Sequence, residues 1–172
     1  MLNKAHFRIF IFVIACILAI SCILYYLPWP SYIHMELNGA MVTSEGAVTP
    51  AGPIVVKGWK LDYLFQKDKL ALDMDLPAAF GWRFEPYDNG PTTRIDHVLG
   101  TPYMIASCAY LDLQEAAFDF GYFALNTQDG LVILYCGDAN AYLVGAVDDT
   151  YDPAQALDYF SEFVRIWDIE KE

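Results

Sequence analysis

The feature that most constrains this chain is a long apolar stretch close to its N-terminus, from Phe7 to Leu27. After Arg8 it holds no charged residue, and about 20 helical residues at 1.5 Å each cross the roughly 30 Å hydrocarbon layer of a bilayer. Pro28 and Pro30 disfavour any continuation of the helix. The sequence therefore predicts an N-terminal segment over residues 1–6, a transmembrane helix over 7–27 and an interfacial linker over 28–32.

The charges that flank this stretch predict its orientation. Lys4 and Arg8 lie at its start, whereas the next basic residue after it is Lys57. Because basic residues accumulate on the cytoplasmic side of membrane helices, we expect a cytoplasmic N-terminus, an extracytoplasmic domain and a cell-membrane location. Aromatic rings that settle at the headgroup level mark the expected outer end, and four are present: Tyr25, Tyr26, Trp29 and Tyr32.

Two other interpretations of the same stretch remain open. Small residues such as Ala15, Ala19 and Ser21 behind a basic start are also typical of a cleaved secretory signal. The run Ala19-Ile20-Ser21-Cys22 resembles a bacterial lipobox, in which Cys22 would be acylated. We favour an uncleaved anchor, because the apolar run is long for a signal peptide and no flexible polar tether follows Cys22.

Charge is distributed unevenly along the chain. All 22 acidic residues lie from Glu36 onward, where they face only eight basic residues, a formal charge of −14. Such a surface repels the phosphate backbone of nucleic acids and anionic lipid headgroups. The composition therefore argues against nucleic acid as a direct partner and favours cationic partners, or simply a soluble acidic surface.

Beyond the apolar stretch the dominant hydrophobic periodicity is two, which predicts β strands. Apolar and polar residues alternate over 33–38, and the clearest hairpin has arms over 54–65 and 70–76. The second arm directs apolar side chains to one face and Asp73 and Asp75 to the other. We therefore expect an antiparallel sheet with one buried and one solvated face.

The C-terminal segment predicts a helix. Asp152 suits the N-cap, Pro153 suits the first helical position, and Gln155 completes a capping-box pattern. Apolar residues recur at helical spacing after it, so we expect a helix over 153–170. The predicted fold class is mostly β (α+β), with an extracytoplasmic domain over 33–172 built from an antiparallel curved sheet or small barrel of about seven or eight strands.

Cys108 and Cys136 are the only cysteines after the apolar stretch, and each falls in a predicted strand. An exported location permits oxidation, so we expect a disulfide between them. In the chain-entropy model a loop of this length would stabilise the fold by roughly 3 to 4 kcal/mol. Two buried thiols are the alternative.

The sequence offers few groups for metal or catalytic chemistry. His34 and His97 are the only domain histidines, and neither has a second ligand at zinc spacing. The acidic run at 148–153 has proline where a calcium loop needs glycine. Phosphate-cradling loops, dinucleotide fingerprints and nucleophile motifs are also missing, so we predict no metal, no cofactor and no catalytic residue.

Aromatic residues make up 16% of the chain, enough to supply an exposed platform as well as a core. An aromatic face could bind a glycan or a peptide, although burial in the core is the simpler interpretation. The candidate residues lie close together along the sequence: Trp59, Tyr63, Trp82 and Tyr87.

The leading functional hypothesis is a non-enzymatic, membrane-anchored module that binds an envelope protein or a glycan through an exposed face of its sheet. One alternative is a carrier of a small apolar ligand, because a small barrel with a C-terminal helix is similar to lipocalin-like carriers. The short glycine-x-tryptophan signature of that group is missing, since Trp59 and Trp82 each follow a glycine directly. Another alternative is a carboxylate-based cell-wall glycan hydrolase, which needs two acidic groups about 5 to 9 Å apart across a cleft.

Overall fold

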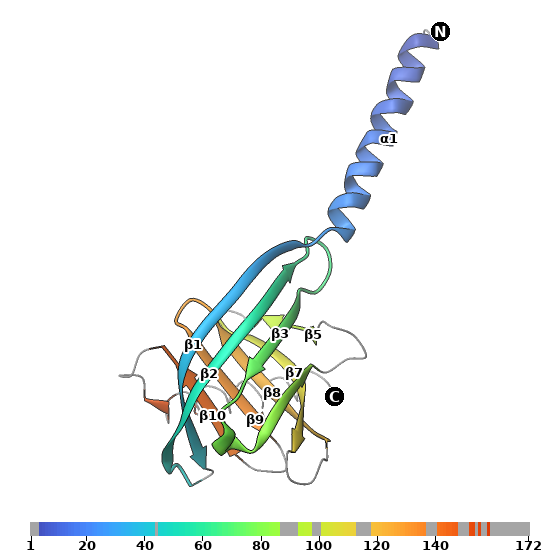
Figure 1. Ribbon diagram of the computed structural model, residues 1–172. Helices are drawn as coiled ribbons and strands as arrows, with labels where there is room; N and C mark the ends of the chain where they lie inside the picture. The colour runs from blue at the N-terminus through green and yellow to red at the C-terminus, as the bar shows by residue number, and fades with distance from the viewer. Residues whose placement is uncertain are drawn as a thin grey trace.

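The structure, a computed structural model, consists of one long helix that stands away from a curled β sheet (Figure 1). It describes residues 4–43, 45–86, 93–97, 101–112, 118–136 and 141–147, together with Asp152, Pro153, Gln155 and Asp158.

The helix, α1, runs from Lys4 to Tyr26, and its side chains are exposed along almost the whole length. The span His6–Tyr26 is long and apolar enough to cross a membrane, and the sheet buries none of it. Large apolar side chains left in water forgo about 1.5 to 3 kcal/mol each relative to burial. The prediction of an N-terminal apolar helix is confirmed, and the helix begins three residues earlier than expected.

The rest of the described chain is almost entirely β, in ten strands of one antiparallel sheet. Eight of them have five residues or more, which agrees with the seven or eight strands predicted. In chain order the strands are β1 (Trp29–Thr43), β2 (Val48–Asp62), β3 (Lys69–Asp75), β4 (Trp82–Pro86), β5 (Thr93–Arg94), β6 (Asp96–His97), β7 (Met104–Asp112), β8 (Phe118–Asn126), β9 (Leu131–Cys136) and β10 (Ala141–Ala146), with a short 3-10 helix, η1 (Ala78–Phe80), between β3 and β4.

The sheet curls into a half-barrel with β1 near its centre (Figure 1). The strand order is β4-β7-β8-β9-β10-β1-β2-β3-β5, and β6 pairs with β7. Thr93 and Arg94 pair with β3, and two residues later Asp96 and His97 pair with β7. This short segment therefore links the two sides of the curl. The predicted curved antiparallel sheet is confirmed.

Three glycines lie next to one another on neighbouring strands, because Gly39 of β1 pairs with both Gly52 of β2 and Gly145 of β10. The pairing of β1 with β2 also shifts register between Gly39 and Ala40. The row leaves room for Ile54, whose Cδ1 would lie 2.8 Å from a Cβ at position 145. Glycines and bulges in this arrangement let a sheet curve strongly, so the row accounts for part of the curl.

Strand β9 is buried on both faces. Val132 and Leu134 belong to the main core, together with residues from β1, β2, β3 and β7. Leu131 and Ile133 point the other way and belong to a second buried cluster with residues of β7, β8 and β10. One buried and one solvated face are expected for the arm 70–76 and are found in β3, whereas both sets of alternating residues are apolar in β9.

The N-terminal end of the domain begins earlier than expected, and most of its C-terminal end lies outside the described residues. Strand β1 already begins at Trp29, inside the segment 28–32 expected as a linker, because Trp29 pairs with Asp62 of β2. The helix expected over 153–170 lies outside the described residues, apart from Pro153, Gln155 and Asp158, and stays a prediction.

Gly58 provides a test of how closely β2 and β3 approach each other. Its φ of +151° disfavours a side chain, and a Cβ there would collide with the backbone carbonyl of Ala71. Gly81 also has a positive φ, +80°, but a Cβ there would meet nothing within 4 Å. We expect Gly58→Ala to lower the free energy of unfolding by about 3 kcal/mol, and Gly81→Ala by about 1 kcal/mol. Urea unfolding of both full-length variants in detergent measures this, and equal losses would contradict the close approach.

Candidate functional site

The C-terminal end of α1 meets the sheet at the loop between β2 and β3, residues 63–68. Figure 1 shows this loop beside the end of the helix, next to the start of β1. Only Leu27 and Pro28 separate α1 from β1. The junction of helix and sheet is therefore compact, and the loop supplies a second connection to the helix in addition to the chain itself.

Gln66 and Phe65 make the contacts between the loop and the helix. Gln66 Nε2 donates a hydrogen bond of 2.9 Å to the carbonyl oxygen of Tyr25. The last four carbonyls of a helix have no partner within the helix, so this bond satisfies one of them. The ring of Phe65 stacks on the ring of Tyr25, with centroids 6.2 Å apart and an interplanar angle of 16°. The loop thus caps the helix and packs against it.

Asp68 holds the loop in shape. Its Oδ1 accepts a hydrogen bond of 2.7 Å from the backbone N–H of Tyr63, and its Oδ2 lies 2.8 Å from Nε2 of His97. Its own carbonyl oxygen accepts a hydrogen bond from the N–H of Ile95. These bonds tie both ends of the loop together and attach the loop to the segment 93–97 that links the two sides of the curl.

The environment of Asp68 favours its charged form. Partial burial alone would raise the pKa of the carboxyl group, but the hydrogen bonds from the Tyr63 N–H and from His97 outweigh it, so the pKa is lowered. A carboxylate with a lowered pKa stabilises the fold at neutral pH, and this contribution disappears as the pH falls below the usual value of 3.8 and through the lowered one.

Large apolar side chains are exposed all around the junction. We call them the junction collar, and they come from the end of α1, the start of β1, the end of β2 and the loop. The members are Tyr25, Tyr26, Leu27, Trp29, Tyr32, Trp59, Leu64 and Phe65, each exposed by 41% or more. Trp59 and Tyr32 face each other across β1 and β2, with ring centroids 5.1 Å apart.

The four residues predicted as membrane-interface anchors, Tyr25, Tyr26, Trp29 and Tyr32, all belong to this collar. Leu64 and Phe65 fall within the range 54–65 that the sequence predicts as one strand, whereas β2 ends at Asp62 and leaves both in the loop. The sequence feature that indicates these two residues is an apolar pair directly before a polar turn.

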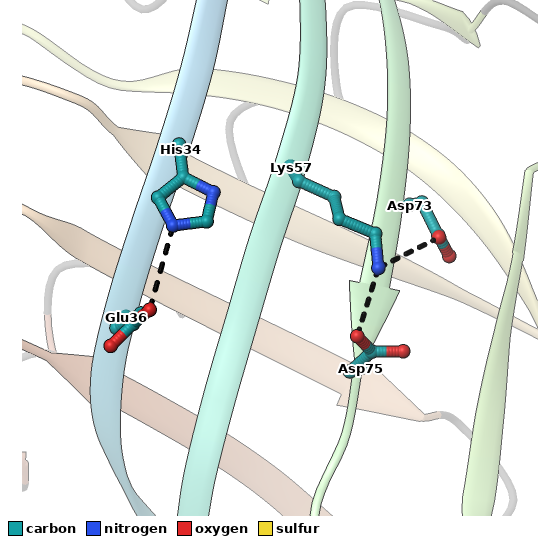
Figure 2. A network of polar contacts seen from close by, with 5 residues as sticks. All are labelled: His34, Glu36, Lys57, Asp73 and Asp75. Carbon is teal, nitrogen blue, oxygen red and sulfur yellow. Dashed lines mark hydrogen bonds and ion pairs between the residues drawn. The ribbon is translucent and has the colours of Figure 1, made fainter.

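A charged strip continues from the collar along the outer face of β1, β2 and β3. Figure 2 shows its five residues: His34, Glu36, Lys57, Asp73 and Asp75. His34, Lys57 and Asp73 are register partners on the three strands, which places them on one face. Lys57 Nζ lies 3.0 Å from Asp75 and 3.4 Å from Asp73, and His34 Nε2 lies 3.5 Å from Glu36.

Lys57 is shared by two carboxylates of β3. The hydrogen bond from Lys57 to Asp75 is the main cause that raises the pKa of the lysine, and Asp73 adds to it. All three side chains are substantially exposed to solvent. Exposed ion pairs contribute little to stability, so the strip is better understood as a surface feature than as a structural one.

Three of the four residues of the predicted aromatic face, Trp59, Tyr63 and Trp82, belong to the described part of the chain. Trp59 contacts Tyr32, Tyr63 lies at the start of the loop with Lys69 Nζ 5.9 Å from its ring centre, and Trp82 packs against the main core. Tyr87 lies outside the described residues.

The predicted disulfide concerns two positions that flank one glycine. Gly121 of β8 pairs with Cys108 of β7 on one side and with Cys136 of β9 on the other. The side chain of Cys136 lies outside the described ones, and the disulfide stays a prediction. Cys22, the lipidation candidate, lies exposed on α1.

Neither clustered metal ligands nor known proteins assign a function to the described residues. Among the described residues, no three His, Cys, Asp or Glu side chains gather closely enough to hold a metal ion. Comparison with protein-family models, with curated proteins and with solved structures finds no match to this chain. The junction collar and the charged strip are therefore the two surface features that bear on function.

Asp68→Ala tests whether the carboxylate holds the loop. The substitution leaves the N–H of Tyr63 without its acceptor, so we expect a loss of about 1 to 3 kcal/mol in the free energy of unfolding at pH 7. The loss should shrink as the pH falls below 3.8, because the wild-type carboxylate then becomes protonated. Denaturant unfolding from pH 7 to pH 2 measures both. The exposed pair partner Asp75→Ala serves as control, with an expected loss within about 0.5 kcal/mol, and a pH-independent loss for Asp68→Ala would contradict the assignment.

Proposed function

We propose that this protein is a membrane-anchored, extracytoplasmic binding module. Its α1 helix spans the membrane, and the outer face of β1, β2 and β3 binds an envelope protein or glycan that carries cationic groups. The observation that carries the proposal is the exposed strip of charges next to the Tyr32–Trp59 pair, on the outer face of β1, β2 and β3.

The membrane part of the proposal is supported by the exposure of the apolar helix along almost its whole length. A helix of this composition inside a soluble domain would be covered by other elements, whereas the sheet covers none of His6–Tyr26. Lys4 and Arg8 at its start and the acidic domain after it fit a cytoplasmic N-terminus.

The binding part is supported by the composition of the outer face. Tyrosine and tryptophan often supply much of the energy of protein interfaces, and Tyr32 and Trp59 are 58% and 48% exposed. Next to them, the strip combines three carboxylates with one lysine and one histidine. Its net charge is negative, so it complements a basic partner and steers the encounter between the two.

The two alternative functions receive less support. A ligand carrier needs an open apolar cavity, but the described interior is occupied by large side chains, such as Phe84 and Phe123 in edge-to-face contact at 5.7 Å. A hydrolase needs one carboxyl group that stays protonated in a cleft. Asp73 and Asp75 instead lie on an exposed strand face, where both contact Lys57 and no cleft encloses them.

The proposal is tested by a photo-crosslinking amino acid placed at His34 in the full-length protein in its native membrane. We expect a defined adduct with an envelope component, identified by mass spectrometry. Asp73→Lys combined with Asp75→Lys should reduce the adduct by about tenfold or more, because it reverses the charge of the strip.

Two controls make this result specific. A crosslinker at Gln128, exposed in the turn between β8 and β9, should give no such adduct, and Glu45→Lys in the turn after β1 should leave the His34 adduct unchanged. Equal adducts from His34 and Gln128, or an adduct that survives the double charge reversal, would contradict the proposed binding face.

A further inference from the structure

We propose that the tip of the β2–β3 loop, Leu64 and Phe65, inserts into the headgroup region of the lipid leaflet from which the domain emerges. The loop would then be a second membrane contact beside α1, and the two contacts together would fix how the domain stands on the bilayer. This inference rests on the proposed membrane span of α1 and goes beyond it, since a span alone does not set how the helix and the sheet tilt against the bilayer.

Exposure of apolar residues is the first observation. Leu64 is 57% and Phe65 is 62% exposed, although both are large apolar side chains. In the described part of the chain beyond β1, the other exposed large apolar residues are Val48, Trp59 and Val147. The apolar surface is thus concentrated at the end of the sheet to which α1 is attached, which is the pattern expected of a membrane contact.

Depth is the second observation. Phe65 stacks on Tyr25, and Gln66 donates to the Tyr25 carbonyl, so the loop tip lies level with the last turn of α1. The last turn of a membrane helix lies where the hydrocarbon layer gives way to headgroups, the depth at which aromatic rings accumulate. Phe65 and Leu64 therefore need no movement of the domain to reach this layer.

Charge is the third observation. Four of the eight basic residues after Arg8 fall within thirteen positions around the loop: Lys57, Lys60, Lys67 and Lys69. Lys60 pairs with Asp62 and Lys67 pairs with Asp96, so acidic groups close to the loop are neutralised. The repulsion of anionic headgroups expected from the net charge of the domain is therefore relieved at this end.

The shape of the loop is already set before any contact with lipid. Asp68 fixes its two ends through Tyr63 and His97, and Gln66 fixes its middle to α1. Insertion of two side chains from an ordered loop loses less conformational entropy than insertion from a flexible one. The apolar tip is thus presented to the headgroup layer in a fixed position.

Tryptophan fluorescence in vesicles tests the insertion directly. Full-length Phe65→Trp and, as an independent position, Leu64→Trp are reconstituted in phosphatidylcholine–phosphatidylglycerol vesicles. Lipids brominated on the upper acyl chain quench tryptophan on contact. We expect them to reduce the fluorescence that each variant adds to wild type by roughly half, as for a residue at the headgroup boundary.

Val48→Trp is the matched control. Val48 is an exposed apolar residue at the far end of β2, up to about 45 Å from the junction along the strand, and its added fluorescence should not be quenched. Unquenched fluorescence at both loop positions would overturn the inference. Fluorescence that changes with the protein-to-lipid ratio and not with bromination would also overturn it, because it would indicate contact with a second copy of the chain. Vesicle flotation separates this failure from that of the anchor, because a protein that floats with the vesicles retains α1 in the membrane.

Discussion

The continuity of α1 with β1 is the constraint on which the rest of the structure depends. Leu27 and Pro28 are the only residues between the apolar helix and β1, which has 15 residues. β1 pairs with β2 on one side and β10 on the other, so without it the sheet would divide into two parts. A force or a lipid layer that acts on α1 therefore acts on the centre of the sheet, because no flexible linker intervenes.

The hydrogen bonds of the β2–β3 loop both cap the end of α1 and hold the loop itself in shape. The end of α1 has carbonyls without partners, and Gln66 satisfies that of Tyr25. The loop itself needs support, and Asp68 provides it through His97 of the segment that links the two sides of the curl. Helix, loop and curl are thus connected by side-chain contacts at this end of the sheet.

Local patterns predicted the parts of the fold that depend on neighbouring residues. The apolar run gave α1, and alternation gave β3, whose Leu72 and Met74 are buried while Asp73 is exposed. The junction could not be predicted, because Gln66 and Tyr25 are 41 positions apart and no pattern in the sequence pairs them. The burial of both faces of β9 was missed for a related reason, since a fully apolar run does not indicate what covers it.

The proposed role requires that α1 cross the membrane and hold the sheet on the extracytoplasmic side. Protease added to intact cells tests it most directly, with an antibody to the domain as the readout. We expect the domain to be digested in intact cells, while the Lys4 end of α1 becomes accessible only after permeabilisation. A domain that survives in intact cells and is lost only after permeabilisation would contradict the orientation and, with it, the proposed binding role outside the cell.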